Sequence, residues 1–279
     1  MAGVKPPMSK FATSWLLACA LLAAAVPCAD DAYAQGWRRA SREPVGLAPD
    51  PALTPEAVVQ VYAARAVSWR GYFGVHTWIA VKPAFAEEYV VYEVMGWRLR
   101  RSGTAVVRSA RAPDGRWFGN APQLLADVRG DEAALAIGQI ERAVAAYPWA
   151  DRYRVWPGPN SNTFTAFVLR DVPALRADLP ATAIGKDYLE PAFAAAAPSG
   201  TGYQLNLFGL LGVLLAAEEG VELNFLGLTL GLDFNTLTLK APLLGRIDTR
   251  YTVLVSLIAL VAVMLLRRRR ASLRAADSL

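Results

Sequence analysis

Residues 75–81, with the sequence VHTWIAV, decide the central part of the fold, because β-branched and aromatic residues dominate this run. The run predicts a strand from residue 74 to residue 81 that carries His76, the only histidine in the chain. Two more runs rich in valine, tyrosine and tryptophan follow at residues 89–99 and 104–109. Together the three runs predict an antiparallel meander.

Three segments around this meander predict helices. Residues 54–67 open with Thr-Pro-Glu, which supplies an N-cap, a first-turn proline and an acidic residue, and apolar side chains then recur at helical spacing. A second helix is predicted from Asp131 to just before Pro148. A third is predicted from Asn160 or Ser161 to Asp171, after a short strand at residues 154–156.

The segment after residue 200 has a different periodicity. Between residues 226 and 234, leucine and phenylalanine alternate with small or polar residues, which predicts strands rather than a membrane helix. Residues 203–217 alone fit either structure, and residues 218–220, Glu-Glu-Gly, predict a hairpin turn. We expect a small antiparallel sheet near a bilayer surface.

Both ends of the chain carry apolar segments. The N-terminus combines lysines, an apolar stretch and Ala-Tyr-Ala at residues 32–34, as in a signal peptide that is cleaved after Ala34. An uncleaved anchor and lipidation at Cys19 are the alternatives. Residues 251–266 contain no charge and predict a transmembrane helix, with a buried C-terminal helix as the alternative. The arginines in the tail, residues 267–279, place that tail in the cytoplasm and the main domain in the periplasm of a bacterial inner membrane.

Composition excludes several classes of function. Both cysteines, Cys19 and Cys28, lie in the predicted leader, so the mature chain has no thiol, and a single histidine cannot build a histidine-rich metal site. We therefore predict no metal and no cofactor. The tail holds five of the arginines and one aspartate, so the net charge of +5 is poor evidence for nucleic-acid binding. Membrane lipid, contacted through residues 251–270, is the predicted partner.

These signals divide the chain into six predicted parts. They are a signal peptide (1–34), a linker (35–53), an α+β domain (54–190), a β-rich appendage (200–245), a transmembrane helix (251–266) and a basic cytoplasmic tail (267–279).

Two short motifs carry a resemblance. Residues 75–81 together with residues 160–164, Asn-Ser-Asn-Thr-Phe, resemble the circularly permuted papain-fold peptidases of the PPPDE and NlpC kinds. Those enzymes pair a His-Thr-x-Ile-x-Val strand with Asn-Cys-Asn-Thr-Phe at the start of a helix. The resemblance implies a circularly permuted papain-like core. Together with the segments described above, we therefore expect an α+β fold with this core, an antiparallel β appendage and a C-terminal transmembrane helix.

A second resemblance covers nearly the whole region that we expect to be exported. The chain is similar to an uncharacterised bacterial domain-of-unknown-function family, number 3750, which brings no known activity. The stretches that carry this resemblance are residues 71–81, 96–100, 117–120, 156–165 and 185–188.

The chain departs from the peptidase motif at one position, because Ser161 stands where the peptidases have their cysteine. A serine hydroxyl is not held ionised by a nearby imidazolium and needs a true general base, which here is His76, oriented by Glu93 or Glu88. The backbone N–H groups of Ser161 and Asn162, with the Asn160 amide, would then stabilise an oxyanion. Alternatively, Ser161 is an ordinary residue at a helix N-terminus and His76 an ordinary strand residue.

Two further sets of residues are weaker candidates. The basic residues around the second and third strands suit an anionic group such as a carboxylate or phosphate, although a solvated strand face is the commoner explanation for such residues. The aromatic residues suit a sugar or peptide cleft, although aromatic residues in strands more often form a core. The basic set is Arg98, Arg100, Arg101, Arg108 and Arg111, and the aromatic set is Trp69, Tyr72, Phe73, Trp78, Trp97, Trp117 and Trp156.

Three functions remain open from the sequence. The first is a membrane-anchored cell-envelope protein whose papain-like cleft binds a peptide, a cell-wall fragment or a lipid headgroup without catalysis. The second is an acyl-transfer hydrolase that uses Ser161 and His76. The third is a structural membrane-associated protein whose sheet rests on the bilayer.

Overall fold

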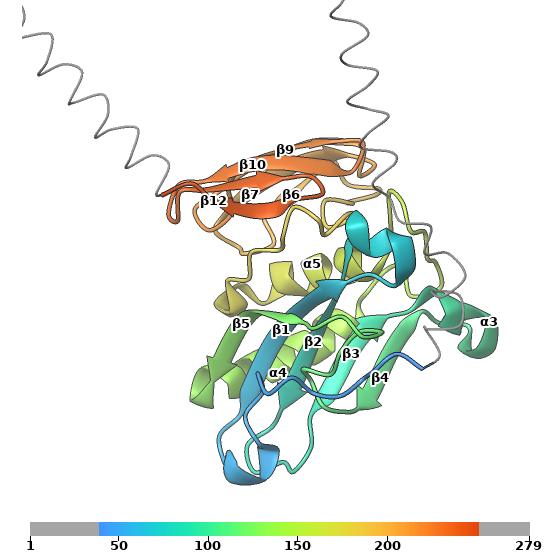
Figure 1. Ribbon diagram of the computed structural model, residues 1–279, viewed down its shortest axis with the longest axis vertical. Helices are drawn as coiled ribbons and strands as arrows, with labels where there is room; N and C mark the ends of the chain where they lie inside the picture. The colour runs from blue at the N-terminus through green and yellow to red at the C-terminus, as the bar shows by residue number, and fades with distance from the viewer. Residues whose placement is uncertain (1–38, 251–279) are drawn as a thin grey trace, which may run out of the picture. The chain divides into compact units, whose positions relative to one another are not determined.

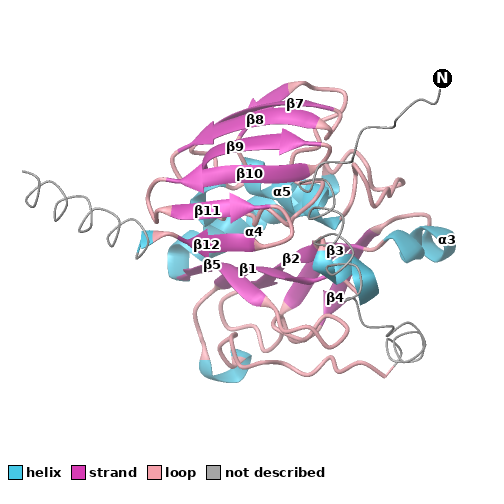
Figure 2. Ribbon diagram, turned by 45° about the horizontal axis from the view of Figure 1, so that its top comes forward, coloured by secondary structure: helices cyan, strands magenta, loops and turns pink. Residues whose placement is uncertain are grey.

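The computed structural model describes residues 39–250, in which the strands form two antiparallel sheets (Figures 1 and 2). The first sheet has five strands in the order β4-β3-β2-β1-β5, and the second has seven strands in the order β12-β11-β10-β9-β8-β7-β6. The five-stranded sheet consists of β1 (Val58–Arg65), β2 (Val75–Lys82), β3 (Val90–Val94), β4 (Val106–Ala110) and β5 (Gln123–Arg129).

Two helices cover one face of the five-stranded sheet. Helix α4 (Gly130–Ala145) packs on β1 and β5, and helix α5 (Ser161–Asp171) packs on β2 and β3. Helix α4 has acidic residues in its first turn, where the helix dipole favours negative charge. The remaining helices are short: η1 (Pro51–Leu53), η2 (Ser68–Tyr72), η3 (Gly96–Arg98), α3 (Leu99–Ser102) and η4 (Pro173–Leu175).

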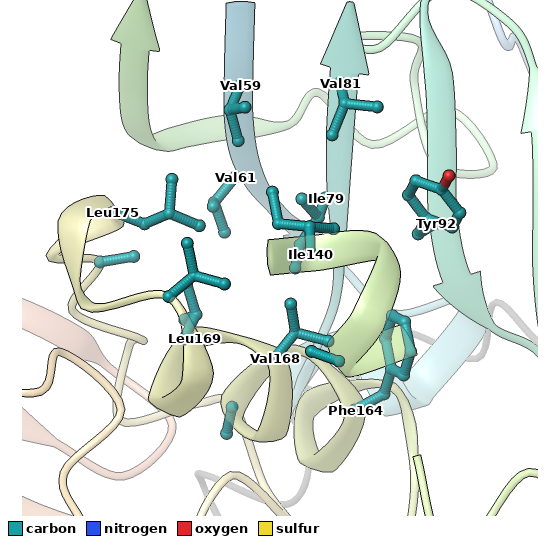
Figure 3. Close-up of a cluster of buried hydrophobic side chains, with 14 of the residues drawn as sticks. Val59, Val61, Ile79, Val81, Tyr92, Ile140, Phe164, Val168, Leu169 and Leu175 are labelled. Carbon is teal, nitrogen blue, oxygen red and sulfur yellow. The ribbon is translucent and has the colours of Figure 1, made fainter. Parts of the chain in front are cut away.

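The main core lies between these helices and the sheet (Figure 3). Val61 and Ile79 project from β1 and β2, and they meet Ile140 of α4 and Leu169 of α5. All four side chains have no exposed surface, so each contributes about 1.5–3 kcal/mol of hydrophobic stabilisation. This burial fixes the two helices on the sheet.

A second, smaller apolar cluster covers the opposite face of the five-stranded sheet. Tyr62 stacks on Trp78 with ring centroids 5.7 Å apart, and Trp117 packs against the same cluster from a loop. The indole Nε1 of Trp78 donates a hydrogen bond to the Pro113 carbonyl at 2.7 Å. Because successive side chains of a strand point to opposite faces, residues 75, 77, 79 and 81 of β2 face the helices, and residues 76, 78 and 80 face this cluster.

The seven-stranded sheet is a simple meander, in which each strand pairs with the next in sequence. Its strands are β6 (Ala194–Ala196), β7 (Gly202–Leu207), β8 (Leu211–Ala216), β9 (Gly220–Phe225), β10 (Leu228–Asp233), β11 (Thr238–Ala241) and β12 (Gly245–Asp248). The turn at residues 217–219 between β8 and β9 lies where the Glu-Glu-Gly sequence predicts a hairpin.

The two faces of the seven-stranded sheet differ sharply in polarity. The inner face is polar and buried, and the register aligns the outward side chains of neighbouring strands on a second face, which is apolar and exposed. We call this second face the outer leucine face. Its exposed members are Tyr203, Leu205, Leu207, Leu211, Val213, Leu215, Leu223, Phe225, Leu228, Leu230, Leu232 and Ile247.

A buried cluster of charges joins the inner face to the rest of the chain. The Glu222 carboxylate on β9 accepts from Lys240 Nζ on β11 at 2.7 Å and also from Lys186, which precedes the sheet. Lys240 also contacts Asp178, and Lys186 lies 3.2 Å from Asp187. These five residues form the buried charge cluster, in which two lysines pair with three carboxylates, and Arg246 adds a further cation at Asp178.

Several local predictions from the sequence are wrong. Residues 54–67 contain strand β1 instead of a helix, residues 154–156 form no strand, and β5 was not predicted. Strand β1 is covered on both faces, so its apolar residues fall on both sides and conceal the alternation of a strand. The β-branched Val58, Val59 and Val61 favour this strand conformation.

The predicted fold class is also contradicted. We expected an α+β fold with a circularly permuted papain-like core, whereas the described residues are dominated by two antiparallel sheets with few helices. The physical reason is that β1 and β5 pair with each other in the sheet. The sequence predicts a helix where β1 lies and no regular element where β5 lies. The expectation of an antiparallel sheet after residue 200 agrees with β7 to β12.

No helix among residues 39–250 is long and apolar enough to cross a membrane. The longest described helix, α4, has 16 residues and reaches about 24 Å, short of a hydrocarbon core of about 30 Å. This finding contradicts the predicted transmembrane helix and, with it, the inner-membrane localisation. The predicted signal peptide, the segment 251–266 and the tail themselves lie outside the described residues.

Candidate functional site

The histidine of β2 and a glutamate of β3 lie together on the sheet face opposite the helices. His76 Nε2 and Glu93 Oε2 are 2.9 Å apart, and Glu93 has no exposed surface. The structure therefore places Glu93 against His76. The other predicted orienting residue, Glu88, is exposed and lies before β3.

Glu93 also binds an arginine, so its carboxylate is held from two sides. Arg111 Nη2 lies 3.2 Å from Glu93 Oε1, while His76 occupies the other oxygen. Burial alone would raise the pKa of Glu93, but the hydrogen bond from His76 and the charges of His76 and Arg111 hold that pKa below its usual value. Glu93 is therefore ionised at neutral pH and fixes both of its partners.

Aromatic rings enclose this group. Trp117 stacks on the His76 ring with centroids 3.7 Å apart and an interplanar angle of 12°. The half-exposed Trp97 stacks on Trp117 in turn, at 6.1 Å. The guanidinium of Arg111 lies over the Trp78 ring, 5.3 Å from its centroid. His76 is thus almost completely covered, with 6% of its surface exposed.

A cavity of about 490 Å³ opens beside this group, and we call it the arginine–tryptophan pocket. Five arginines line it, against one carboxylate, Glu93, which is already engaged. Arg108 donates to the Tyr92 hydroxyl, and Arg42 lies over the Phe118 ring. The lining residues are Arg42, Glu93, Met95, Trp97, Arg98, Val107, Arg108, Ser109, Arg111, Ala112, Gly115, Arg116 and Trp117.

The predicted nucleophile lies on the other face of the sheet. The Thr77 hydroxyl, on the helix side of β2, donates to the Ser161 carbonyl at 3.2 Å and approaches Thr165 of α5 at 2.9 Å. His76, one residue earlier, points to the opposite face. Among the hydrogen bonds of residues 39–250, none joins the Ser161 and His76 side chains. The structure thus brings His76 to Glu93 and does not join it to Ser161.

The two asparagines that flank Ser161 serve the helix. Asn160 Oδ1 accepts from the backbone N–H groups of Asn162 and Thr163, and Thr163 Oγ1 accepts from the Asn160 N–H, which completes a capping box. The amide of Asn160 donates to the carbonyls of Val155 and Ile184. The Asn162 N–H and the Asn160 amide, two of the three donors that we expected to stabilise an oxyanion, are therefore already engaged.

Asn162 is similarly engaged, because its amide donates to the carbonyls of Val75 and Ile184. Gly185 approaches the Asn160 side chain so closely that a Cβ at this position would clash with it. With φ at +95°, Gly185 also has a backbone conformation that other residues rarely adopt. The motif at residues 160–164 thus fixes the loop before α5 and the loop at 182–185 to the helix.

Sequence reasoning proposed the arginines and the tryptophans as two separate sets, and the structure places members of both in one pocket. Arg98, Arg108, Arg111, Trp97 and Trp117 line it, whereas Arg100 and Arg101 do not. Arg42 and Arg116 were missed, and no spacing in the sequence connects them with β3. Within residues 39–250, no group of three or more His, Cys, Asp or Glu side chains is placed to hold a metal ion.

A family model described as "Protein of unknown function (DUF3750)" matches residues 56–188. This match includes β1 to β5, both long helices and most residues of the arginine–tryptophan pocket. The domain at residues 56–188 belongs to this family, as the sequence resemblance indicated. Neither the curated proteins nor the solved structures gave a match, and the resemblance to papain-fold peptidases is not supported.

Proposed function

We propose that the protein is a binding module for a small anionic ligand, which the arginine–tryptophan pocket holds without chemical conversion. One observation carries this proposal: five arginines line one cavity, and its only carboxylate is already bound by His76 and Arg111. Of the five, Arg108 bonds to the Tyr92 hydroxyl on the helix side of the sheet. Positive charge therefore remains uncompensated around the cavity. Its volume lies within the usual range for small-molecule sites, about 300–1,000 Å³.

The side chains indicate the chemical class of the ligand. Guanidinium groups match carboxylate and phosphate groups because they donate two parallel hydrogen bonds. Trp97 is 52% exposed and offers a flat apolar surface to a ring. A sugar or an aromatic ring that bears a carboxylate or a phosphate satisfies both requirements.

The group formed by His76, Glu93 and Arg111 supports binding better than catalysis. Glu93 is fully buried and holds Arg111 at the wall of the pocket, so Arg111 is positioned before a ligand arrives. A hydrolase that uses Ser161 and His76 requires the base within hydrogen-bond reach of the nucleophile. The two side chains leave β2 and α5 on opposite faces of the sheet, which gives that alternative no geometric support.

Binding can be tested with ligands that differ only in charge. The quenching of tryptophan fluorescence should be measured for glucose 1-phosphate, glucuronate and indole-3-acetate, with glucose and indole as neutral counterparts. We expect at least one anion to bind and its neutral counterpart to fail, because the arginines supply most of the attraction. Absence of binding by all three anions, or equal binding of the neutral compounds, would contradict the proposal.

A matched pair of variants locates the site. Arg98→Ala removes a guanidinium from the pocket, whereas Arg101→Ala removes one that lies three residues later and outside it. We expect Arg98→Ala to weaken binding of the anion about tenfold, the equivalent of one charged hydrogen bond, and Arg101→Ala to leave it unchanged. Equal effects of the two substitutions would show that the ligand binds elsewhere.

A further inference from the structure

The outer leucine face gathers twelve exposed apolar side chains on one side of a single sheet. The outward positions of β7 to β12 carry no charged residue, and cross-strand pairs such as Leu205 with Val213 and Leu230 with Leu223 continue the face from strand to strand. Leu205 is 62% exposed and Leu230 50% exposed. The largest apolar patch of a typical monomer is about 300–600 Å², and patches beyond this mark a binding surface.

The sheet cannot bury this face by turning over. Its inner face carries Glu222 and Lys240, which are bound to Lys186 and Asp178 of the preceding segment. Turning the sheet over would break the ion pairs of Glu222 with Lys186 and of Lys240 with Asp178, at a large cost in free energy. The buried charge cluster therefore holds the leucines outward, where a partner has to cover them.

The chain that follows the sheet indicates the kind of partner. Strand β12 ends at Asp248, and the uncharged sequence 251–266 begins three residues later and is followed by four arginines at 267–270. In the sequence, apolar residues and clustered basic residues thus follow the last strand of the sheet. A second copy of the chain would match only the leucines, whereas an anionic bilayer offers hydrocarbon to the leucines and negative headgroups to the arginines.

We propose that the outer leucine face is a docking surface for an anionic lipid bilayer. The leucines enter the boundary between headgroups and acyl chains, and the sheet lies along the surface. This contact needs no helix that spans the bilayer. The backbone groups within the sheet are bonded to neighbouring strands, which is the condition for placing backbone next to hydrocarbon.

The test uses an environment-sensitive fluorophore at one position of the full chain. Cys19 and Cys28 are replaced by serine, and a single cysteine is introduced as Leu230→Cys or Val213→Cys on the face. Leu135→Cys, on α4 and 74% exposed, is the matched control. Each labelled protein is mixed with vesicles of phosphatidylcholine and phosphatidylglycerol that contain a phosphatidylcholine with a nitroxide quencher on its acyl chain.

We expect the emission of both face probes to shift to shorter wavelength and to be quenched, while the Leu135 probe stays unchanged. Introducing Leu223→Glu beside the Val213 probe should weaken this vesicle binding about tenfold, because a charge replaces a leucine that enters the bilayer in this proposal. Unquenched face probes would overturn the proposal, as would equal quenching at Leu135. If the emission of the face probes shifts without vesicles, increasingly so with protein concentration, and does not respond to lipid, the partner is a second copy of the chain instead.

Discussion

The five-stranded and the seven-stranded sheets place their polar side chains differently. Strand β2, at the centre of the first sheet, is buried along nearly its whole length and carries apolar residues on both faces. Strand β10, in the second sheet, alternates exposed Leu228, Leu230 and Leu232 with buried Thr229 and Asp233. In the first sheet most buried side chains are apolar. In the second sheet the polar side chains are buried and the apolar ones are exposed.

This difference shows that alternation in a sequence defines two faces of a strand but does not say which one is buried. Which face is buried depends on the side chains that the rest of the chain packs against the sheet. For β1 and β2 the apolar faces of α4 and α5 are available. For β9 and β11, Lys186 and Asp178 supply charges that pair with Glu222 and Lys240. The inward face is therefore determined by electrostatic complementarity.

The largest expected effect comes from breaking the buried charge cluster. Glu222→Gln removes the carboxylate shared by Lys186 and Lys240 and leaves each lysine with one carboxylate, Asp187 or Asp178. Removing one partner from a buried group of ions costs about 3–5 kcal/mol in the free energy of unfolding. Urea denaturation followed by tryptophan fluorescence measures this loss, and Trp156 reports on the sheet because its indole donates to the Leu226 carbonyl. A loss below about 1 kcal/mol would mean that charge pairing does not orient the sheet.

Glu218→Gln is the matched control for this substitution. Glu218 pairs with Arg176 at 3.9 Å at the surface, where both side chains are substantially exposed to solvent. Exposed ion pairs contribute about 0–1 kcal/mol, so the control should unfold almost like the parent protein.

A pair of leucine substitutions compares the two sheets directly. Leu169→Ala empties a site with no exposed surface beside the five-stranded sheet, and we expect a loss of about 2–5 kcal/mol. Leu230→Ala, on a side chain that is 50% exposed, should change the free energy of unfolding in lipid-free buffer by less than about 0.5 kcal/mol. Similar losses for both, measured by urea denaturation, would show that the outer leucine face is already covered within the protein.

A smaller effect than that of Glu222→Gln is pH-dependent and belongs to the five-stranded sheet. Glu93→Gln removes hydrogen bonds between charged groups that are worth about 1.5–3 kcal/mol. The pKa of Glu93 in the folded protein lies below its ordinary value of 4.5. Its contribution is therefore complete above this pH and is lost as the pH falls through the folded pKa. The difference in unfolding free energy between parent and variant, measured from pH 7 downward, should be constant at first and then shrink; a growing difference would contradict this sign.

The elements with strong local signals were predictable from the sequence. Helix α5 begins at its Asn160 cap and α4 opens with acidic residues, so both helices are close to their predicted positions. Strand β2 has β-branched and aromatic residues without a competing helical spacing. Strand β1 was not recognisable, because a strand buried on both faces loses its alternation, and β5 gains its place only by pairing with β1.

The candidate site was predictable only in its separate parts. Thr77 and His76 are neighbours in sequence, yet one contacts α5 and the other Trp117, because a strand turns successive side chains to opposite faces. The resemblance to a Cys–His motif led us to expect His76 on the same side of the sheet as Ser161, whereas the pleat turns His76 to the opposite side. The pairing of His76 with Glu93 depends on the arrangement of β2 and β3, and that of Glu93 with Arg111 on the chain beyond β4, neither of which a linear motif contains.

The strand order of the second sheet has a consequence for how the chain folds. Each strand from β6 to β12 pairs with its successor, so every pairing closes a short loop, and structures built from local contacts form fast. The pairing of β1 with β5 instead joins residues such as Val58 and Arg129, and the loop between them is slow to close. The meander can therefore assemble early, but its orientation becomes permanent only when the earlier part of the chain presents Lys186 to Glu222.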